Sequence, residues 1–260
     1  MVIASLANER VRYARSLHRE RVRIRERRFL IEGVRLVEEA LRAGTRPVLA
    51  FHSPELTGTD RGRILLADLT RASESVVAVS PEVMASLSET VTPQGVVAVV
   101  PMPELLPSLR GPAVVLDGLR DPGNVGTILR TAWAAGAGIV IVLRGTADPY
   151  ASKVVRSGMG AHFHVPIRAA ATVQDLSRLL DGRRILLAHP AGRPYWEIDW
   201  RDNPALIVGG EARGSELAAP LAQELVAVPM SEGVESLNAA VAAGVLLFEA
   251  LRQRATASDA

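Results

Sequence analysis

The chain has 260 residues, of which 48% are apolar and only 4% aromatic, so its core must be built from Leu, Val, Ile and Ala. It contains no cysteine, which excludes disulfides, thiolate metal sites and cysteine nucleophiles. The net charge is +2, but residues 1–46 carry a balance of +6 and the remainder a balance of −4.

The first residues lack the basic and then apolar pattern of a secretory signal. The apolar run at 239–248 is also too short to cross a bilayer. We therefore expect a soluble, cytoplasmic protein of one or two domains.

The most basic segment stands at the start of the chain, where residues 1–46 hold twelve Arg. Such an uneven distribution suggests that this segment meets a polyanion, and Arg suits bidentate contacts with phosphate. The alternative is a solvated helix face whose charges form local ion pairs. Charge alone leaves both interpretations open.

Residues 1–100 have the pattern of a small alternating α/β domain. A short apolar element covers 29–33, and strands are predicted at 48–51, 76–79 and 96–100. Helices are predicted at 8–28, 34–43, 64–72 and 81–87. Gly44 is expected to end the second helix, since glycine adopts a positive φ readily.

Residues 101–111 form a proline-rich linker, because proline removes backbone donors and restricts its neighbours. A second alternating series occupies 112–260. Its predicted strands are 113–116, 139–143, 162–166, 185–188, 205–208 and 225–228; its predicted helices are 125–135, 152–157, 173–180, 216–221 and a last, apolar helix, followed by a polar tail after Arg252. Short apolar strands separated by helices indicate a mostly parallel sheet covered on both faces, and therefore an α/β fold.

The loop after the first strand of this second domain is rich in glycine and polar residues. Within VVLDGLRDPGNVGTILRTAWAAGAG (114–138), Asn124 stands at a helix start and Arg130 roughly two turns further on. In open parallel sheets, ligands bind beyond the carboxyl ends of the strands. Neither a dinucleotide fingerprint nor a phosphate loop is present. Asn124 is either a helix cap with Arg130 a surface partner of an acid, or both face a ligand.

A second strand end, LIVGGEARGSEL (206–217), continues into Gly209, Gly210 and Glu211. Glu211 is either a capping carboxylate near the next helix or a carboxylate in the ligand crevice.

The third segment is VPMSEGVESLNAAVAAGVLLFEAL (228–251), in which a polar loop leads into a helix without polar side chains over 239–248. We expect this helix to be buried on all sides, with Ser236 as its cap. A second polar residue, Asn238, is not required for capping. Ser236 and Asn238 therefore either brace neighbouring loops or face a bound molecule.

Other candidate sites are weaker. His162 and His164 alternate on one predicted strand face without a third ligand, so we expect structural histidines and no metal. Ser231 and Ser236 have no histidine in a nucleophile-like motif, which argues against a serine hydrolase.

Taken together, these segments resemble the SpoU (TrmH) family of RNA ribose methyltransferases, part of the SPOUT class. LDGLRDPGNVGTILRTAWAAGAG, LIVGGEARGSEL and VPMSEGVESLNAAVAAGVLLFEA are similar to the family's three ordered motifs, and RSGMGAHFHVPI (156–167) to the segment between the first two. FLIEGVRLVEEALRAG resembles part of the family's N-terminal substrate-binding domain. One departure is Gly210, where the family usually has Asn or another polar residue before the glutamate.

The resemblance implies a deep trefoil knot in the C-terminal domain, a ribosomal-protein-like fold for residues 1–100, bound S-adenosylmethionine, a homodimer and an RNA substrate, most readily large-subunit ribosomal RNA. A transfer-RNA methyltransferase, or a non-catalytic RNA-binding or ribosome-assembly module, remains the alternative. The residues carried over are Asn124, Arg130, Glu211, Ser236 and Asn238 for catalysis; Gly209, Gly210, Val228, Met230 and Leu237 for the cofactor; and Arg21, Arg23, Arg25 and Arg130 for RNA.

In this scheme, Gly209 and Gly210 let the backbone approach the cofactor, and no metal is needed because the sulfonium donor supplies its own leaving group. Arg130 is expected to stabilise the developing alkoxide rather than to act as a base, since a guanidinium stays protonated. Asn124 and Glu211 would orient Arg130 and the target ribose.

Overall fold

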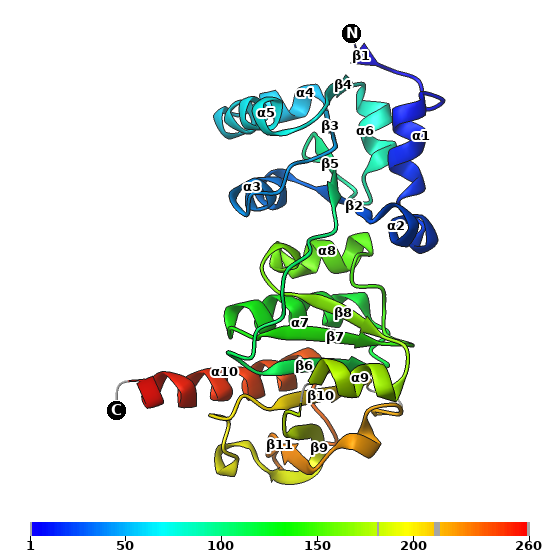
Figure 1. The fold of residues 1–260 in the computed structure, drawn as a ribbon. Helices are drawn as coiled ribbons and strands as arrows, with labels where there is room; N and C mark the ends of the chain where they lie inside the picture. The colour runs from blue at the N-terminus through cyan, green and yellow to red at the C-terminus, as the bar shows by residue number, and fades with distance from the viewer. Residues whose placement is uncertain (1, 181, 211–213, 259–260) are drawn as a thin grey trace. The chain divides into compact units, whose positions relative to one another are not determined.

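The computed structural model describes residues 2–180, 182–210 and 214–258. The chain divides into two compact units (Figure 1). Unit 1 comprises Met1–Pro103 with Tyr150–Phe163, and unit 2 comprises Glu104–Pro149 with His164–Ala260. The segment Tyr150–Phe163 therefore packs within unit 1, although the domain boundaries predicted from the sequence place it in the second domain.

Unit 1 is built on a five-stranded mixed sheet with the order β1-β4-β3-β5-β2. Its strands are β1 (Val2–Ile3), β2 (Arg28–Glu32), β3 (Leu49–His52), β4 (Val76–Val79) and β5 (Val96–Pro101). Its helices are α1 (Glu9–Ser16), α2 (Glu20–Glu26), α3 (Val34–Arg42), α4 (Pro54–Thr57), α5 (Asp60–Ala72), α6 (Pro81–Leu87), α8 (Ser152–Gly158) and the 3₁₀ helix η1 (Ala161–Phe163).

Both faces of this sheet are covered. Strand residues such as Phe29 and Ala98 pack with apolar residues of α3 and α5 on one face, and Val97 and Val99 pack with those of α1, α2 and α6 on the other. Gly44 has a φ of +78° just after α3, which confirms the predicted end of that helix.

The single helix predicted over 8–28 is wrong, because α1 ends at Ser16 and α2 begins at Glu20. Arg23 is only 4% exposed, and its guanidinium donates to the carbonyl oxygens of Leu17 and His18 at 2.7 and 2.8 Å. These carbonyls lie at the end of α1, where no helical N–H reaches them. The side chain of Arg23 therefore holds the turn between the two helices.

Unit 2 contains a six-stranded parallel sheet with the order β11-β9-β10-β6-β7-β8. Its strands are β6 (Ala113–Asp117), β7 (Ile139–Leu143), β8 (Ile167–Ala170), β9 (Ile185–Pro194), β10 (Ala205–Gly209) and β11 (Glu224–Ala227). Its helices are α7 (Pro122–Ala134), α9 (Val173–Leu180), α10 (Ala239–Ser258) and the 3₁₀ helices η2 (Tyr195–Glu197) and η3 (Ala219–Leu221).

Helices cover both faces of this sheet as well. Strand residues including Val115, Ile141 and Ile207 share one cluster with Leu176 and Leu180 of α9. On the opposite face α7 and α10 pack side by side (Figure 1). The α/β fold with a mostly parallel, doubly covered sheet is confirmed.

Two predicted elements of the second series are wrong. Residues 162–166 contain no strand, because Ala161–Phe163 form η1 and the strand begins at Ile167. His162 is buried between the rings of Phe29 and Tyr150, and His164 stacks on Trp133 with centroids 4.2 Å apart. The helix predicted at 216–221 is reduced to η3. Aromatic packing, which depends on distant partners, decides the first of these differences.

The last helix also differs from its prediction in length and exposure. α10 continues through the predicted polar tail as far as Ser258. Val241 and Phe248 are 53% and 49% exposed, so the helix is not buried on all sides. No helix within the described residues is long and apolar enough to cross a membrane.

Candidate active site

The centre of the unit 2 sheet opens a crevice at its carboxyl edge. β6 and β10 are neighbours, with Asp117 opposite Gly209 at their ends. From β6 the chain proceeds to β7 on one side, whereas β11, which follows β10, lies at the opposite edge of the sheet. Loops that leave neighbouring strands in opposite directions form the usual ligand crevice of such sheets.

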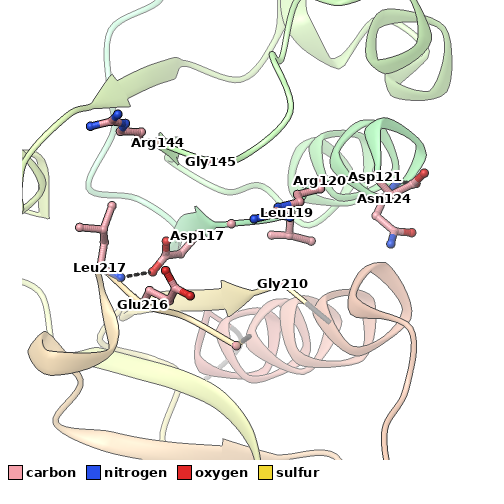
Figure 2. Close-up of a pocket in the computed structure, with 12 residues that line it drawn as sticks. Asp117, Leu119, Arg120, Asp121, Asn124, Arg144, Gly145, Gly210, Glu216 and Leu217 are labelled. Atoms are coloured by element: carbon pink, nitrogen blue, oxygen red, sulfur yellow. Dashed lines mark hydrogen bonds between the residues drawn. The ribbon is translucent and has the colours of Figure 1, made fainter. Parts of the chain in front are cut away.

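The buried carboxylate of Asp117 joins the two loops. It is 2% exposed, and its Oδ2 accepts from Ser215 Oγ at 2.6 Å and from the backbone N–H groups of Leu217 and Ala218 at 2.8 and 2.9 Å (Figure 2 shows the Leu217 bond). A buried carboxylate needs such donors to offset its lost hydration. Asp117 therefore fixes the chain beyond β10 to the end of β6.

Two glycines at the end of β10 are required by close backbone contacts. A Cβ at Gly210 would collide with the carbonyl of Gly118, and one at Gly209 with the backbone of Gly214 and Ser215. Gly210 also exchanges two backbone hydrogen bonds with Gly214, of 3.0 and 2.9 Å. The neighbouring backbone therefore explains both glycines, where the sequence had suggested approach to a cofactor.

Asn124 and Asn238, which lie 114 positions apart, meet in the structure. Asn238 Nδ2 donates to Asn124 Oδ1 at 3.0 Å. The Oδ1 of Asn238 accepts from the N–H groups of Ala240 and Val241, so Asn238 caps α10 and the predicted cap Ser236 does not. Asp121 caps α7 by accepting from the Asn124 N–H at 2.8 Å. The side chain of Asn124 is therefore engaged with the third motif.

A cavity of about 350 Å³ lies at the ends of β6 and β7 (Figure 2). It is lined by Asp117, Gly118, Leu119, Arg120, Asp121, Asn124, Arg144, Gly145, Gly210, Gly214, Glu216 and Leu217. We call it the polar cavity. Exposed Arg side chains enter its lining from the loops after both strands, and Asn124 and Asp121 lie at the start of α7.

A second cavity, of about 280 Å³, lies beyond the ends of β9, β10 and β11. We call it the apolar cavity. Its lining consists of Leu187, Ala188, His189, Pro190, Val208, Gly209, Gly210, Gly214, Ser215, Val226, Val228, Met230, Ser236, Leu237, Ala239, Ala242 and Leu246. All five residues predicted to bind the cofactor are among these, as is Ser236. Since Gly210 and Gly214 line both cavities, the two are adjacent.

The remaining predicted residues are not gathered in these cavities. Arg130 is an exposed residue of α7 that lines neither cavity, about 9 Å along the helix axis from Asn124. Glu211 falls outside the described residues. No cluster of three or more His, Asp or Glu side chains that could hold a metal occurs among the residues described.

Arg23 was predicted to bind RNA, but its side chain is buried. Its guanidinium donates to the carbonyl oxygens of the turn between α1 and α2, so it does not face solvent. Arg21 is exposed, and Arg25 is exposed beside Glu26, with a nitrogen–oxygen distance of 2.8 Å. Arg23 and Arg25 have the same local sequence character, so only tertiary contacts distinguish them.

Comparison with known proteins shows the family of the chain. Residues 111–248 match the SpoU rRNA Methylase family, and residues 8–98 match the MRM3-like substrate binding domain. The 23S rRNA (guanosine(2553)-2'-O)-methyltransferase RlmP of Bacillus subtilis is 36% identical over 251 residues, covering 95% of this chain and 97% of that protein.

Solved structures resemble the whole chain. An AdoMet-bound rRNA methyltransferase from Sinorhizobium meliloti superposes with a TM-score of 0.82 at 32% identity, covering 97% of both chains. The SpoU methyltransferase AviRb from Streptomyces viridochromogenes, in complex with AdoMet, gives 0.85 at 29% identity, covering 96% of this chain and 99% of that one.

The α/β fold, with its crevice between the loops after β6 and β10, and these similarities together define a methyltransferase of the α/β type. The chain belongs to the SpoU rRNA methylase family. It is an RNA 2'-O-methyltransferase that depends on S-adenosylmethionine, as the sequence predicted.

The apolar cavity fits this cofactor chemically. Aliphatic side chains such as Leu187, Val226 and Leu246 can enclose a planar, weakly polar ring, and the ends of three strands present backbone N–H and C=O groups to its edges. The adjoining polar cavity provides side-chain donors and acceptors.

Proposed function

We propose that this chain methylates the ribose 2'-hydroxyl of a nucleotide in large-subunit ribosomal RNA, in the cytoplasm. The observation that carries the proposal is the Asn124–Asn238 hydrogen bond, because it brings the first and third motifs together beside two adjacent cavities. The relative RlmP, by its name, methylates a guanosine of 23S rRNA at the 2'-oxygen.

In this proposal the apolar cavity holds S-adenosylmethionine, which supplies an electrophilic methyl carbon when bound. Val228, Met230 and Leu237 enclose its adenine, while Gly209 and Gly210, which have no side chains, leave room for the rest of the molecule. Ser236, which lines the same cavity, is placed to contact the cofactor. The chain would thus bind the donor mainly through shape and backbone contacts.

The polar cavity would receive the target nucleotide. Asn124, whose side chain is held by its bond to Asn238, lies in the lining of this cavity, where it is placed to orient the ribose or its phosphate. Positioning of this kind contributes much of the rate enhancement of a displacement reaction. The guanidinium of Arg130 would stabilise negative charge on the 2'-oxygen; it is unsuited to remove the proton because it remains protonated.

A homodimer explains why Arg130 lies outside the cavities of its own chain. α10 exposes the side chains of Val241 and Phe248 beside α7, the helix that carries Arg130. Large exposed apolar side chains are typical of contact surfaces. We infer that two copies pack through α7 and α10, so that Arg130 of one copy completes the site of the other. The knot remains a prediction of the family resemblance.

The function is tested by titrating the protein with S-adenosylmethionine in a calorimeter and then measuring transfer of its tritiated methyl group to ribosomal and transfer RNA. We expect label in the 2'-O-methyl group of one large-subunit nucleotide. Label in transfer RNA alone would contradict the substrate class, and cofactor binding without transfer to either RNA would contradict the proposed reaction.

The composite site is tested with two inactive variants. Arg130→Ala should retain cofactor binding and lose turnover, whereas Arg178→Ala, on the exposed face of α9, should retain both. When Arg130→Ala and Asn124→Ala subunits are mixed and reassociated, about a quarter of the wild-type activity should return, because half of the dimers are mixed and each carries one intact site. No recovery on mixing would contradict a site that is shared between subunits.

A further inference from the structure

A groove of about 880 Å³ runs along α1 and the start of α2 in unit 1. It is lined by Glu9, Arg12, Tyr13, Arg15, Ser16, His18, Arg19, Arg25 and Ser86. We call it the arginine groove. Four of its nine lining side chains are guanidinium groups and one is a carboxylate, so its surface is strongly basic.

Helical spacing places three of these arginines on one face. Arg12, Arg15 and Arg19 stand at positions i, i+3 and i+7, which lie above one another on a helix. Backbone bonds from His18 to Arg15 and from Arg19 to Ser16 continue the spiral past the end of α1. The opposite face, with Val11 and Ala14, is fully buried against the sheet. The orientation of the arginine face is therefore fixed by the core.

These three guanidinium groups are not neutralised within unit 1. Arg12, Arg15 and Arg19 are exposed, and their side chains make no hydrogen bond or ion pair with any residue that the structure describes. By contrast, four exposed arginines of α3 and α5 are paired with acids: Arg42 with Glu39, Arg61 with Glu38, Arg63 with Asp60, and Arg71 with Asp68. Within the basic segment at residues 1–46, the alternative interpretation of local ion pairing therefore holds for Arg42 and fails for Arg12, Arg15 and Arg19.

A second depression of unit 1, near the start of α3, is less basic. Its lining contains two arginines, Arg35 and Arg156, and Arg156 lies 3.1 Å from Glu32 and 3.6 Å from Glu89. The arginine groove, with four guanidinium groups and one carboxylate, is the more positive of the two. A row of uncompensated guanidinium groups is suited to a ligand with regularly spaced anions, because each guanidinium can donate hydrogen bonds to two phosphate oxygens.

We propose that the arginine groove binds the sugar-phosphate backbone of the RNA substrate through Arg12, Arg15 and Arg19. The proposal rests on the proposed function, since it takes RNA as the substrate. Arg12 and Arg15 are separated by about 4.5 Å along the axis of α1, a rise of the same order as the spacing of adjacent phosphates, and Arg19 follows in the turn that leads to α2. Arg25 lines the same groove, whereas the buried Arg23 donates to the carbonyls of the turn between α1 and α2.

The test is the salt dependence of RNA binding by the full chain. Fluorescence anisotropy with a labelled transcript of large-subunit ribosomal RNA gives Kd at a series of potassium chloride concentrations. Each lost phosphate contact reduces the slope of log Kobs against log salt by about 0.7 to 0.9. The variant Arg12→Gln/Arg15→Gln/Arg19→Gln should therefore lose about two units of slope and bind at least about tenfold more weakly at low salt.

The matched control is Arg61→Gln/Arg63→Gln/Arg71→Gln, which removes the same net charge from the paired arginines of α5. It should change the slope by less than one unit. A triple lysine variant at 12, 15 and 19 retains the charge and should restore most of the slope. Cofactor titration, which depends on unit 2, should give the same affinity in all variants and so reports on folding.

Equal slopes for the groove variant and the α5 control would overturn the proposal. If the wild-type protein methylates ribosomal RNA under that outcome, the reaction stands and only the groove is wrong. If the groove variant loses slope but the wild-type protein transfers no methyl group to any RNA, the groove stands as an RNA site and the proposed function fails.

Discussion

The bond between Asn124 and Asn238 can be separated experimentally from the capping of α10. Asn238 has two tasks, because its Oδ1 caps the helix while its Nδ2 donates to Asn124. Serine caps a helix about as well as asparagine but has no amide and is too short to reach Asn124. Asn238→Ser therefore removes one task, and Asn238→Ala removes both.

The two variants should differ in stability and agree in activity. Loss of the cap in Asn238→Ala costs about 1 kcal/mol, or about 2 to 4 °C in Tm for a domain of this size. Asn238→Ser loses at most about 1 kcal/mol for an exposed hydrogen bond. Both should lower kcat about 10- to 100-fold, because Asn124 is no longer oriented.

The measurements are thermal unfolding, calorimetric titration with S-adenosylmethionine, and tritium transfer to ribosomal RNA. Asn124→Ala provides the partner for a double-mutant cycle with Asn238→Ala, in which a shared role appears as non-additive losses of kcat. Full turnover in Asn238→Ser would refute the reasoning, since it would show that activity depends on the cap of α10 and not on the bond to Asn124.

Three further changes test the frame around the site. Asp117→Ala should destabilise the protein by about 2 to 6 kcal/mol, because two buried backbone N–H groups lose their acceptor; chemical denaturation measures this loss, and a change below 1 kcal/mol would contradict it. Gly210→Ala should cost about 1 to 3 kcal/mol and weaken cofactor binding in calorimetry, because its Cβ collides with the Gly118 carbonyl. The Arg252 guanidinium lowers the pKa of Glu249 below its ordinary value. Since this carboxylate contributes stability above its unfolded pKa and loses it as the pH falls through the folded pKa, Glu249→Gln should lower Tm at neutral pH. The difference should shrink as the pH falls below the ordinary glutamate pKa of about 4.3 and disappear below the lowered pKa of the folded state.

The sequence predicted the second sheet well because its strands are short runs without polar residues. Such runs, separated by helices, have few other arrangements available. The predicted strands at 113–116, 139–143 and 205–208 are therefore confirmed within one residue. The five predicted cofactor residues that line the apolar cavity were identified from the family motifs and not from periodicity.

The side chains that were misjudged depend on contacts between distant residues. Ser236 and Asn238 are equally good caps by composition, and a bond to Asn124, 114 positions away, accompanies the choice of Asn238. Arg23 is a different case, because its partners are near in the chain: its guanidinium donates to the carbonyls of Leu17 and His18 across a turn between α1 and α2, where the sequence predicted one continuous helix. The role of Asp117 was not predicted, because its donors lie 98 to 101 positions further along the chain. Local patterns cannot distinguish such residues.

These contacts give α10 an unusual position in the molecule. Its first turn is capped by the residue that holds Asn124, and one side of the same helix presents Val241 and Phe248 to the surface. In the proposed dimer that side packs against a second copy, so association and the orientation of Asn124 act through one rigid element. A substitution such as Val241→Asp should then reduce turnover in proportion to the loss of dimer, measured by light scattering. The cap uses the backbone N–H of Val241 and not its exposed side chain, so the Asn124–Asn238 bond should survive in the monomer, and cofactor binding with it.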